Sequence, residues 1–141
     1  MIETGDKFYS ALLLMMDVSM ESQQRNQSPL LGYYDWLREF CTIKMAGPRR
    51  SGHNYIIDRL MVDHPCDNFR VITPYGDRYP LLPASQVVKK SSFPLGSHVA
   101  NWNEFFIIVN GASKYSASDL EYMYLACVSG RRDYRHIILL Q

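Results

Sequence analysis

Two short apolar segments constrain the fold of this chain most strongly. They are EFFIIVN, residues 104–110, and HIILLQ, residues 136–141. Successive apolar residues without polar alternation are typical of parallel strands that helices cover on both faces. CTIKMA, residues 41–46, and NFRVITP, residues 68–74, are two further candidate strands, the second rich in β-branched and aromatic residues. These segments predict a buried, mainly parallel sheet.

Segments with the periodicity of amphipathic helices alternate with these strands. In the last of them, Ser118 and Glu121 have the spacing of a capping box, and Gly130 is expected to end the helix. Residues 74–100 form a long connection rich in proline and glycine, in which residues 84–90 are expected to form a short helix. Helices are predicted at residues 6–24, 34–40, 53–62 and 116–129.

Alternation of strands and helices indicates the fold class. It predicts an α/β fold in which helices cover a mainly parallel sheet of about four strands, with an N-terminal helix packed on the sheet. We expect a single domain over residues 1–141, composed of an N-terminal helical segment 1–39 and an α/β core 40–141. Hydrophobic residues make up 47% of the chain and charged residues 21%, a balance that argues against disorder.

Charge and cysteine content restrict the partners and the compartment. The formal net charge of +1 provides no overall field that would attract nucleic acid or a membrane surface. Cys41, Cys66 and Cys127 are widely spaced and form no CxxC pair, which suits mostly buried thiols in a reducing compartment. The apolar run at residues 11–16 is too short to span a bilayer. We therefore expect a cytoplasmic protein without a membrane partner.

The segment GPRRSGHN, residues 47–54, joins a predicted strand to a predicted helix. Its glycines have the spacing of a phosphate-binding loop, G-x-x-x-x-G-K-[S/T], with His53 and Asn54 in the last two places. Such a loop directs backbone N–H groups at an anion, and the following helix N-terminus adds partial positive charge. The plain alternative is a strand–helix turn in which Ser51 caps the helix.

With this loop and two later strand ends, the chain resembles the P-loop NTPase superfamily over residues 36–141. In that superfamily a later strand ends in an acidic residue that orders Mg²⁺, and Asn110 ends the corresponding strand here. One branch of the superfamily has an extra strand between the strand before the loop and the strand that ends in the acid. In that branch a further strand ends in a polar sensor residue, and Gln141 occupies this position here. The resemblance implies a three-layer core. It also implies nucleotide- or phosphate-binding roles for Gly47, Arg49, Arg50, Ser51, Gly52, His53 and Asn54, with Asn110 and Gln141 at the Walker B and sensor positions.

Three departures from the family pattern indicate a degenerate site. His53 replaces the lysine, Asn54 the hydroxyl that holds Mg²⁺, and Asn110 the Walker B acid. Phosphoryl transfer depends on the positioning and charge stabilisation that those groups supply, so hydrolysis should fall by orders of magnitude. We assign no catalytic residue and no metal ligand. ATP or another nucleotide could still bind if a nearby phosphate raises the pKa of His53 so that it carries a proton, and if Arg49 and Arg50 reach phosphate oxygens. Whether Mg²⁺ accompanies it stays open.

We therefore expect a small degenerate P-loop protein that does not hydrolyse nucleotide and acts through another protein or through self-association. Nucleotide binding at the loop is expected to be weak or absent. The small size and reduced motifs resemble accessory proteins of viruses or mobile elements, which is an analogy from fold alone. The main alternative is an active ATPase or nucleotide kinase with a nonstandard loop, in which His53 and a loop arginine replace the lysine.

Basic residues form two further local groups. Lys89 and Lys90, together with the two loop arginines, raise a second alternative, a nucleic-acid-binding accessory factor. Arg131, Arg132 and Arg135 lie between the last helix and the last strand, and we expect them on the solvated surface.

Overall fold

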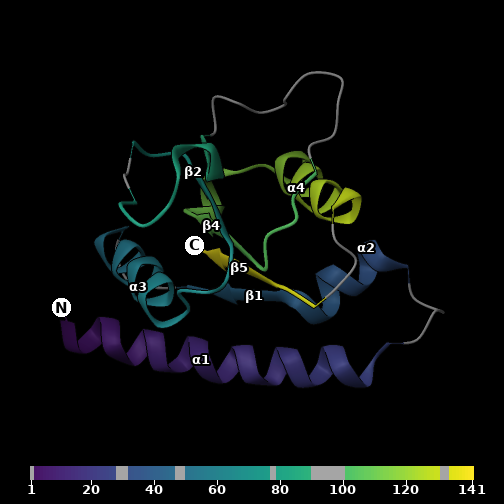
Figure 1. Cartoon of the computed structure of the whole chain (residues 1–141), viewed down its shortest axis with the longest axis horizontal. Helices are drawn as coiled ribbons and strands as arrows, with labels where there is room; N and C mark the ends of the chain where they lie inside the picture. The colour runs from purple at the N-terminus through teal and green to yellow at the C-terminus, as the bar shows by residue number, and fades with distance from the viewer. Residues whose placement is uncertain (1, 28–31, 47–49, 77–78, 90–100, 131–133) are drawn as a thin grey trace.

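The computed structural model describes residues 2–27, 32–46, 50–76, 79–89, 101–130 and 134–141, with only the backbone for residues 2–4, 50 and 51. Within these residues the chain forms a parallel sheet of five strands in the order β1-β5-β4-β2-β3 (Figure 1). The elements are α1 (Ile2–Arg25), α2 (Tyr33–Trp36), η1 (Leu37–Cys41), β1 (Thr42–Met45), α3 (Arg50–Asp63), β2 (Phe69–Thr73), η2 (Ala84–Gln86), β3 (Val87–Lys89), β4 (Phe106–Asn110), η4 (Ala112–Lys114), α4 (Ala117–Ser129) and β5 (His136–Leu140).

Helices cover the two faces of the sheet. α1 and α3 pack on one face, and α2, η1 and α4 pack on the other (Figure 1). The crossovers β1–α3–β2 and β4–α4–β5 run along the sheet in opposite directions. Because such crossovers are right-handed, opposite directions place their helices on opposite faces. The predicted α/β class with a parallel sheet is therefore confirmed.

β4 and β5 lie inside the sheet, and every residue of both strands is buried. Side chains of one parity enter the core beneath α1 and α3, whereas those of the other parity enter the core beneath α4. Both faces of these strands therefore need apolar residues, which is why their sequences show no alternation. The strands predicted from the two uninterrupted apolar runs are confirmed.

The sheet contains a fifth strand that the sequence analysis did not predict. β3 occupies the second half of the segment 84–90, where a helix was expected, and the helical part is limited to one 3₁₀ turn, η2. Val87 and Val88 pair in register with Val71 and Ile72 of β2. Tertiary pairing with β2 thus decides the conformation of a valine pair whose intrinsic preference is for strands.

The capping box of α4 also differs from the prediction. The N-cap is Ser116, whose hydroxyl accepts a hydrogen bond from Asp119 N at 3.1 Å. The Asp119 carboxylate in turn accepts one from Ser116 N at 3.1 Å. The reciprocal pattern is thus carried by an Asp at the third helical position and not by Ser118 and Glu121. Gly130 ends the helix as predicted.

α1 is an amphipathic helix, as predicted, and extends beyond the predicted residues 6–24 at both ends. Leu12 is fully buried against the sheet, whereas Leu14 and Val18 on another side of the helix are 68% and 63% exposed. Among the described residues, no helix combines the length and the apolar character needed to cross a bilayer.

Two of the three cysteines are buried. Burial raises the pKa of Cys41 to about 12 and that of Cys127 to about 11, so both thiols stay protonated at neutral pH. Cys66 is exposed, which differs from the expectation of mostly buried thiols at this one position.

Arg135, expected on the surface, is instead fully buried. Its guanidinium donates hydrogen bonds to the backbone oxygens of Cys127 at 2.9 Å, Trp102 at 2.6 Å and Glu104 at 2.8 Å. Gln23 of α1 bonds both the N–H and the C=O of Arg135. The side chain therefore connects the end of α4 to the segment that leads into β4. Arg131 and Arg132 lie outside the described residues.

A buried histidine at the start of β5 predicts a specific loss of stability in mild acid. Burial, and secondarily the nearby His64, lower the pKa of His136 to about 4, while Asp17 opposes the shift weakly. Between its ordinary pKa near 6.5 and about 4, the unfolded chain binds a proton that the folded chain excludes. The free energy of unfolding should therefore fall as pH decreases through this window, by about 3 kcal/mol from this residue.

Urea denaturation of the protein and of His136→Phe at several pH values would test this expectation. In the variant, the slope of the free energy of unfolding against pH should decrease by the amount that corresponds to about one proton. Phenylalanine can pack with Phe105 and Phe106 but cannot titrate. Identical slopes for the two proteins between pH 6.5 and 4 would show that His136 is not the group responsible.

Candidate functional site

The N-terminal turns of α3 lie at the carboxyl edge of the sheet, where β4 also ends. α3 begins at Arg50 and not at residue 53, so Gly52, His53 and Asn54 already belong to the helix. Gly47 and Arg49 lie outside the described residues, and the side chains of Arg50 and Ser51 are not described. Side chains of the predicted loop are therefore placed only for its last three residues.

Four polar side chains from three segments form a hydrogen-bonded cluster at this edge: His53 and Asn54 of α3, Tyr79, and Asn110 at the end of β4. The Asn110 amide oxygen lies 3.2 Å from His53 Nδ1. The Asn110 amide nitrogen donates to Asn54 Oδ1 at 3.0 Å and to the Tyr79 hydroxyl at 2.9 Å. The Tyr79 hydroxyl donates to Asn54 Oδ1 at 3.2 Å. We call these four residues the amide–histidine cluster.

His53 is a neutral member of this cluster. The side chain is 4% exposed, and burial lowers its pKa below the ordinary value, an effect that the Asn110 hydrogen bond opposes only in part. With the Asn110 oxygen as acceptor, the proton is on Nδ1, which leaves a lone pair on Nε2. Nε2 is buried and has no hydrogen-bond partner within the described part of the chain. The expectation that a bound phosphate protonates His53 thus begins from a histidine that favours the neutral form.

The residue after Asn110 shapes the edge of the site. Gly111 has a φ of +74°, a left-handed conformation that favours glycine. A Cβ at this position would lie 3.0 Å from the Tyr75 hydroxyl oxygen, so the glycine also lets Tyr75 approach the backbone. β4 therefore ends in an Asn-Gly pair that directs the amide towards α3 and turns the chain away from the sheet.

Tyr79 is a member of the cluster that no sequence motif predicted. It lies before Pro80 in the long connection after β2, far in sequence from both α3 and β4. The side chain is nevertheless 4% exposed, and its hydroxyl bonds both asparagines of the cluster. A tyrosine in a loop carries no motif, so only the fold brings it to this edge.

Gln141 lies at the same edge of the sheet but outside the amide–histidine cluster. β5 runs between β1 and β4, and Asn110 pairs in register with Leu140. Gln141 follows directly, with an exposed side chain and a backbone N–H that donates to Met45 O at 2.9 Å. The structure therefore brings three of the predicted site residues, His53, Asn54 and Asn110, into one hydrogen-bonded group and places Gln141 nearby.

The residues behind the nucleic-acid alternative are mostly outside the described part of the chain. Lys89 is exposed at the end of β3, at the opposite edge of the sheet from β1. Lys90 and Arg49 are not described, and of Arg50 only the backbone is described. Within the described residues, no group of three or more His, Cys, Asp or Glu side chains is arranged to hold a metal ion.

No protein-family model, no curated protein and no solved structure matches this chain. The geometry and charge of the site itself are therefore the basis for assigning a function.

Proposed function

We propose that this chain is a degenerate P-loop protein that does not hydrolyse nucleotide and acts through protein–protein contact. Binding of ATP or another nucleotide at the loop is weak or absent. The observation that carries the proposal is the amide–histidine cluster. At the three positions where the family pattern places a lysine, a hydroxyl and an acid, this chain has uncharged side chains that bond one another.

The sheet order supports a P-loop-like core. One strand, β5, lies between β1, which precedes the loop, and β4, which ends in Asn110. This is the arrangement expected of the branch with an extra strand between the loop strand and the Walker B strand. α3, which follows β1, and α4, which follows β4, also pack on opposite faces of the sheet. Open α/β sheets bind their ligands at the carboxyl ends of the strands where the chain changes from one face to the other.

The charges of the cluster argue against phosphoryl transfer. A transferred phosphoryl group needs positive charge around its oxygens and a ligand set for Mg²⁺. His53 is neutral and presents a lone pair, which repels a phosphate oxygen instead of bonding to it. The Asn54 oxygen accepts hydrogen bonds from Asn110 and Tyr79. For a nucleotide to bind here, its phosphates would have to raise the pKa of His53 until the histidine is protonated. The free energy needed for that protonation would weaken nucleotide binding.

Thermal unfolding with and without millimolar ATP, ADP and Mg²⁺ tests this proposal. Ligand near its dissociation constant stabilises a protein by only about 0.4 kcal/mol, so we expect a shift of Tm below about 2 °C. Phosphate release in the presence of ATP and Mg²⁺ should stay at the level of a buffer blank.

Two variants of Gly52 show whether any shift comes from the loop. Gly52→Asp places a carboxylate in the first turn of α3, where it repels phosphate but interacts favourably with the helix dipole. Gly52→Asn has nearly the same size without the charge. A shift of several degrees that is lost in Gly52→Asp alone, together with phosphate release that His53→Ala reduces, would contradict the proposal. That result would favour the alternative of an active ATPase or kinase.

A further inference from the structure

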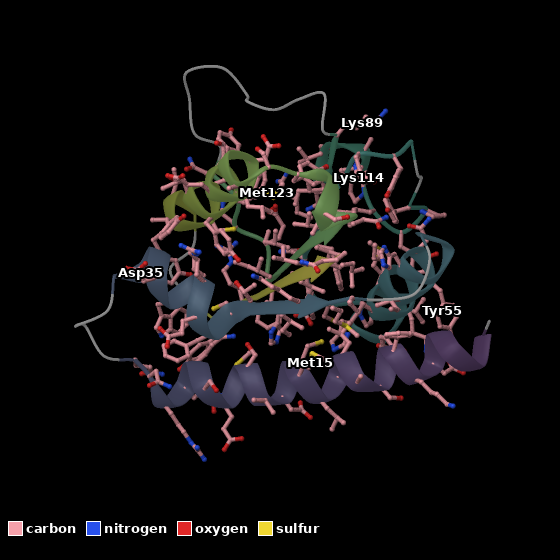
Figure 2. All side chains as sticks on the ribbon, turned by 180° about the vertical axis from the view of Figure 1, so that it is seen from behind. Met15, Asp35, Tyr55, Lys89, Lys114 and Met123 are labelled. Atoms are coloured by element: carbon pink, nitrogen blue, oxygen red, sulfur yellow. The ribbon has the colours of Figure 1, made fainter. Side chains whose placement is uncertain are left out.

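β1 forms one edge of the sheet, and a groove lies beside this edge on each face of the sheet. One groove, of about 390 Å³, lies on the α1 face between α1 and η1. The other, of about 610 Å³, lies on the opposite face between α2, η1 and α4. Glu39, Thr42 and Lys44 line both grooves. Figure 2 shows this side of the molecule, with Met15 on α1 and Asp35 on α2.

The backbone of β1 can accept another strand at this edge. Met45 O accepts a hydrogen bond from Gln141 N, so the backbone groups of Met45 point towards β5. Successive residues of a strand point their backbone groups to opposite sides, so those of Lys44 point to the open edge. An edge with directed N–H and C=O groups is a template for pairing with a further strand.

The groove on the α1 face combines apolar lining residues with polar ones such as Ser19 and Glu39. Its lining includes Leu14, Met15 and Val18 of α1, together with Phe40 and Ile43. Of the six large hydrophobic residues that are exposed in the described part of the chain, these three α1 residues are half. Leu14 and Val18 lie one helical turn apart, so they form one stripe beside the edge. A contiguous apolar patch of this kind is typical of a contact surface.

The groove on the other face is charged, with an excess of carboxylates. Asp35, Glu39 and Glu121 line it, against two cations, Arg38 and Lys44. All five of these side chains are exposed. An incoming strand at this edge must therefore alternate, with apolar side chains on the α1 face and preferably basic or neutral polar ones on the other.

β1 itself has the alternation that this edge requires. Ile43 and Met45 belong to the core on the α1 face, whereas Thr42 and Lys44 line the charged groove. We propose that the β1 edge is a homodimer interface in which β1 of a second copy pairs antiparallel with β1. The two-fold axis passes beside Ile43 and perpendicular to the sheet, so each face of one copy continues into the same face of the other.

One register satisfies both the backbone and the charges. With Ile43 opposite Ile43 of the second copy, Thr42 lies opposite Lys44, and Lys44 N–H donates to Thr42 O of the second copy, twice by symmetry. Lys44 of the second copy then extends over the groove with the carboxylate excess. Shifting the strands to place Lys44 opposite Lys44 would instead set like charges against each other, which is unfavourable. The α1 stripes of the two copies meet over the joined sheets.

This inference rests on the interaction role proposed above and names its partner as a second copy of the chain. Sedimentation equilibrium of the full chain, from micromolar to near-millimolar concentration, tests it with two matched variants. Val18→Glu and Val62→Glu each put a carboxylate on an exposed helix surface, because both valines are 63% exposed, but only Val18 lies beside the edge. We expect a dimer whose dissociation constant rises at least about tenfold in Val18→Glu and is unchanged in Val62→Glu.

Lys44→Pro tests the strand pairing itself. Proline removes an N–H that points to the open edge, so the pairing of β1 with β5 keeps its hydrogen bonds and the fold is retained. The dissociation constant should again rise at least about tenfold, whereas Lys44→Gln, which keeps the N–H, should have a smaller effect. Unfolding curves at concentrations where the protein is monomeric check that both variants are folded.

A monomer at every concentration overturns the inference, as does a dimer that Val18→Glu and Lys44→Pro leave unchanged. Neither outcome bears on the nucleotide measurements. A monomer without a nucleotide-dependent shift would remove the second copy as partner and leave the proposed loss of phosphoryl-transfer chemistry in place. A monomer that releases phosphate from ATP would contradict both.

Discussion

Arg135→Met is expected to lower the free energy of unfolding by about 4 kcal/mol or more, although methionine fills much of the same volume. The guanidinium donates to three backbone oxygens, those of Trp102, Glu104 and Cys127. Hydrogen bonds from charged donors contribute about 1.5–3 kcal/mol each, an effect that the cost of burying the cation partly offsets. Methionine avoids the cost of burying a cation, but it leaves the three backbone oxygens in the core without the hydrogen bonds that the guanidinium donates.

Urea denaturation of Arg135→Met beside Arg25→Met provides the measurement and its control. The Arg25 side chain is 74% exposed and pairs with Glu21 on the same helix, so its replacement should change stability by less than about 0.5 kcal/mol. If the two variants were equally stable, the buried guanidinium would not be needed for the fold. A large loss in Arg135→Met alone would show that the cation satisfies the backbone around Trp102.

Gly130→Ala is expected to destabilise the chain by at least about 3 kcal/mol and to prevent folding if the backbone cannot move. A Cβ at this position would lie 2.1 Å from Trp102 O and 2.7 Å from Trp102 C. The φ of Gly130 is −89°, so the penalty expected here comes from contact with Trp102 and not from a left-handed φ. Backbone atoms cannot rotate away as the end of a side chain can, and Arg135 also holds this carbonyl.

Gly76→Ala is the matched control for this substitution. Among the described residues, chain neighbours aside, no heavy atom lies within 4 Å of a Cβ built at Gly76, so alanine should be tolerated and change stability by less than about 1 kcal/mol. Thermal unfolding and circular dichroism of the two variants test the contrast. Equal stability would mean that the chain near Trp102 is free to shift. A collapse of Gly130→Ala alone would identify the contact between the end of α4 and Trp102 as tight.

Local sequence patterns were sufficient for the central strands and most helices. Ile107 and Ile108 of β4 belong to the cores on opposite faces of the sheet. The uninterrupted apolar run predicts this burial on both faces. The helix expected at residues 84–90 was wrong because pairing with β2 selects a strand for Val87 and Val88. Valine itself favours strands, but the partner strand β2 lies too far away in the sequence for a local pattern to reveal the pairing.

The candidate site was predictable only where motif spacing applies. The spacing of the loop places His53 and Asn54 at the start of a helix, and the apolar run places Asn110 at the end of a strand. Their hydrogen bonds are consistent with the two segments meeting at one edge of the sheet. Tyr79 belongs to no motif, and the pKa of His53 depends on burial, which a sequence pattern does not report.

The sequence by itself determined the α/β class, because each segment's hydrophobic pattern shows whether one or two of its faces are covered. It also determined which polar residues stand at the loop and strand ends. Only the tertiary structure decided that β5 lies between β1 and β4, that β1 is an edge with a groove on each face, and that Arg135 is buried. Those features depend on contacts between residues that are far apart in the chain, and a local sequence pattern does not show which of these contacts form.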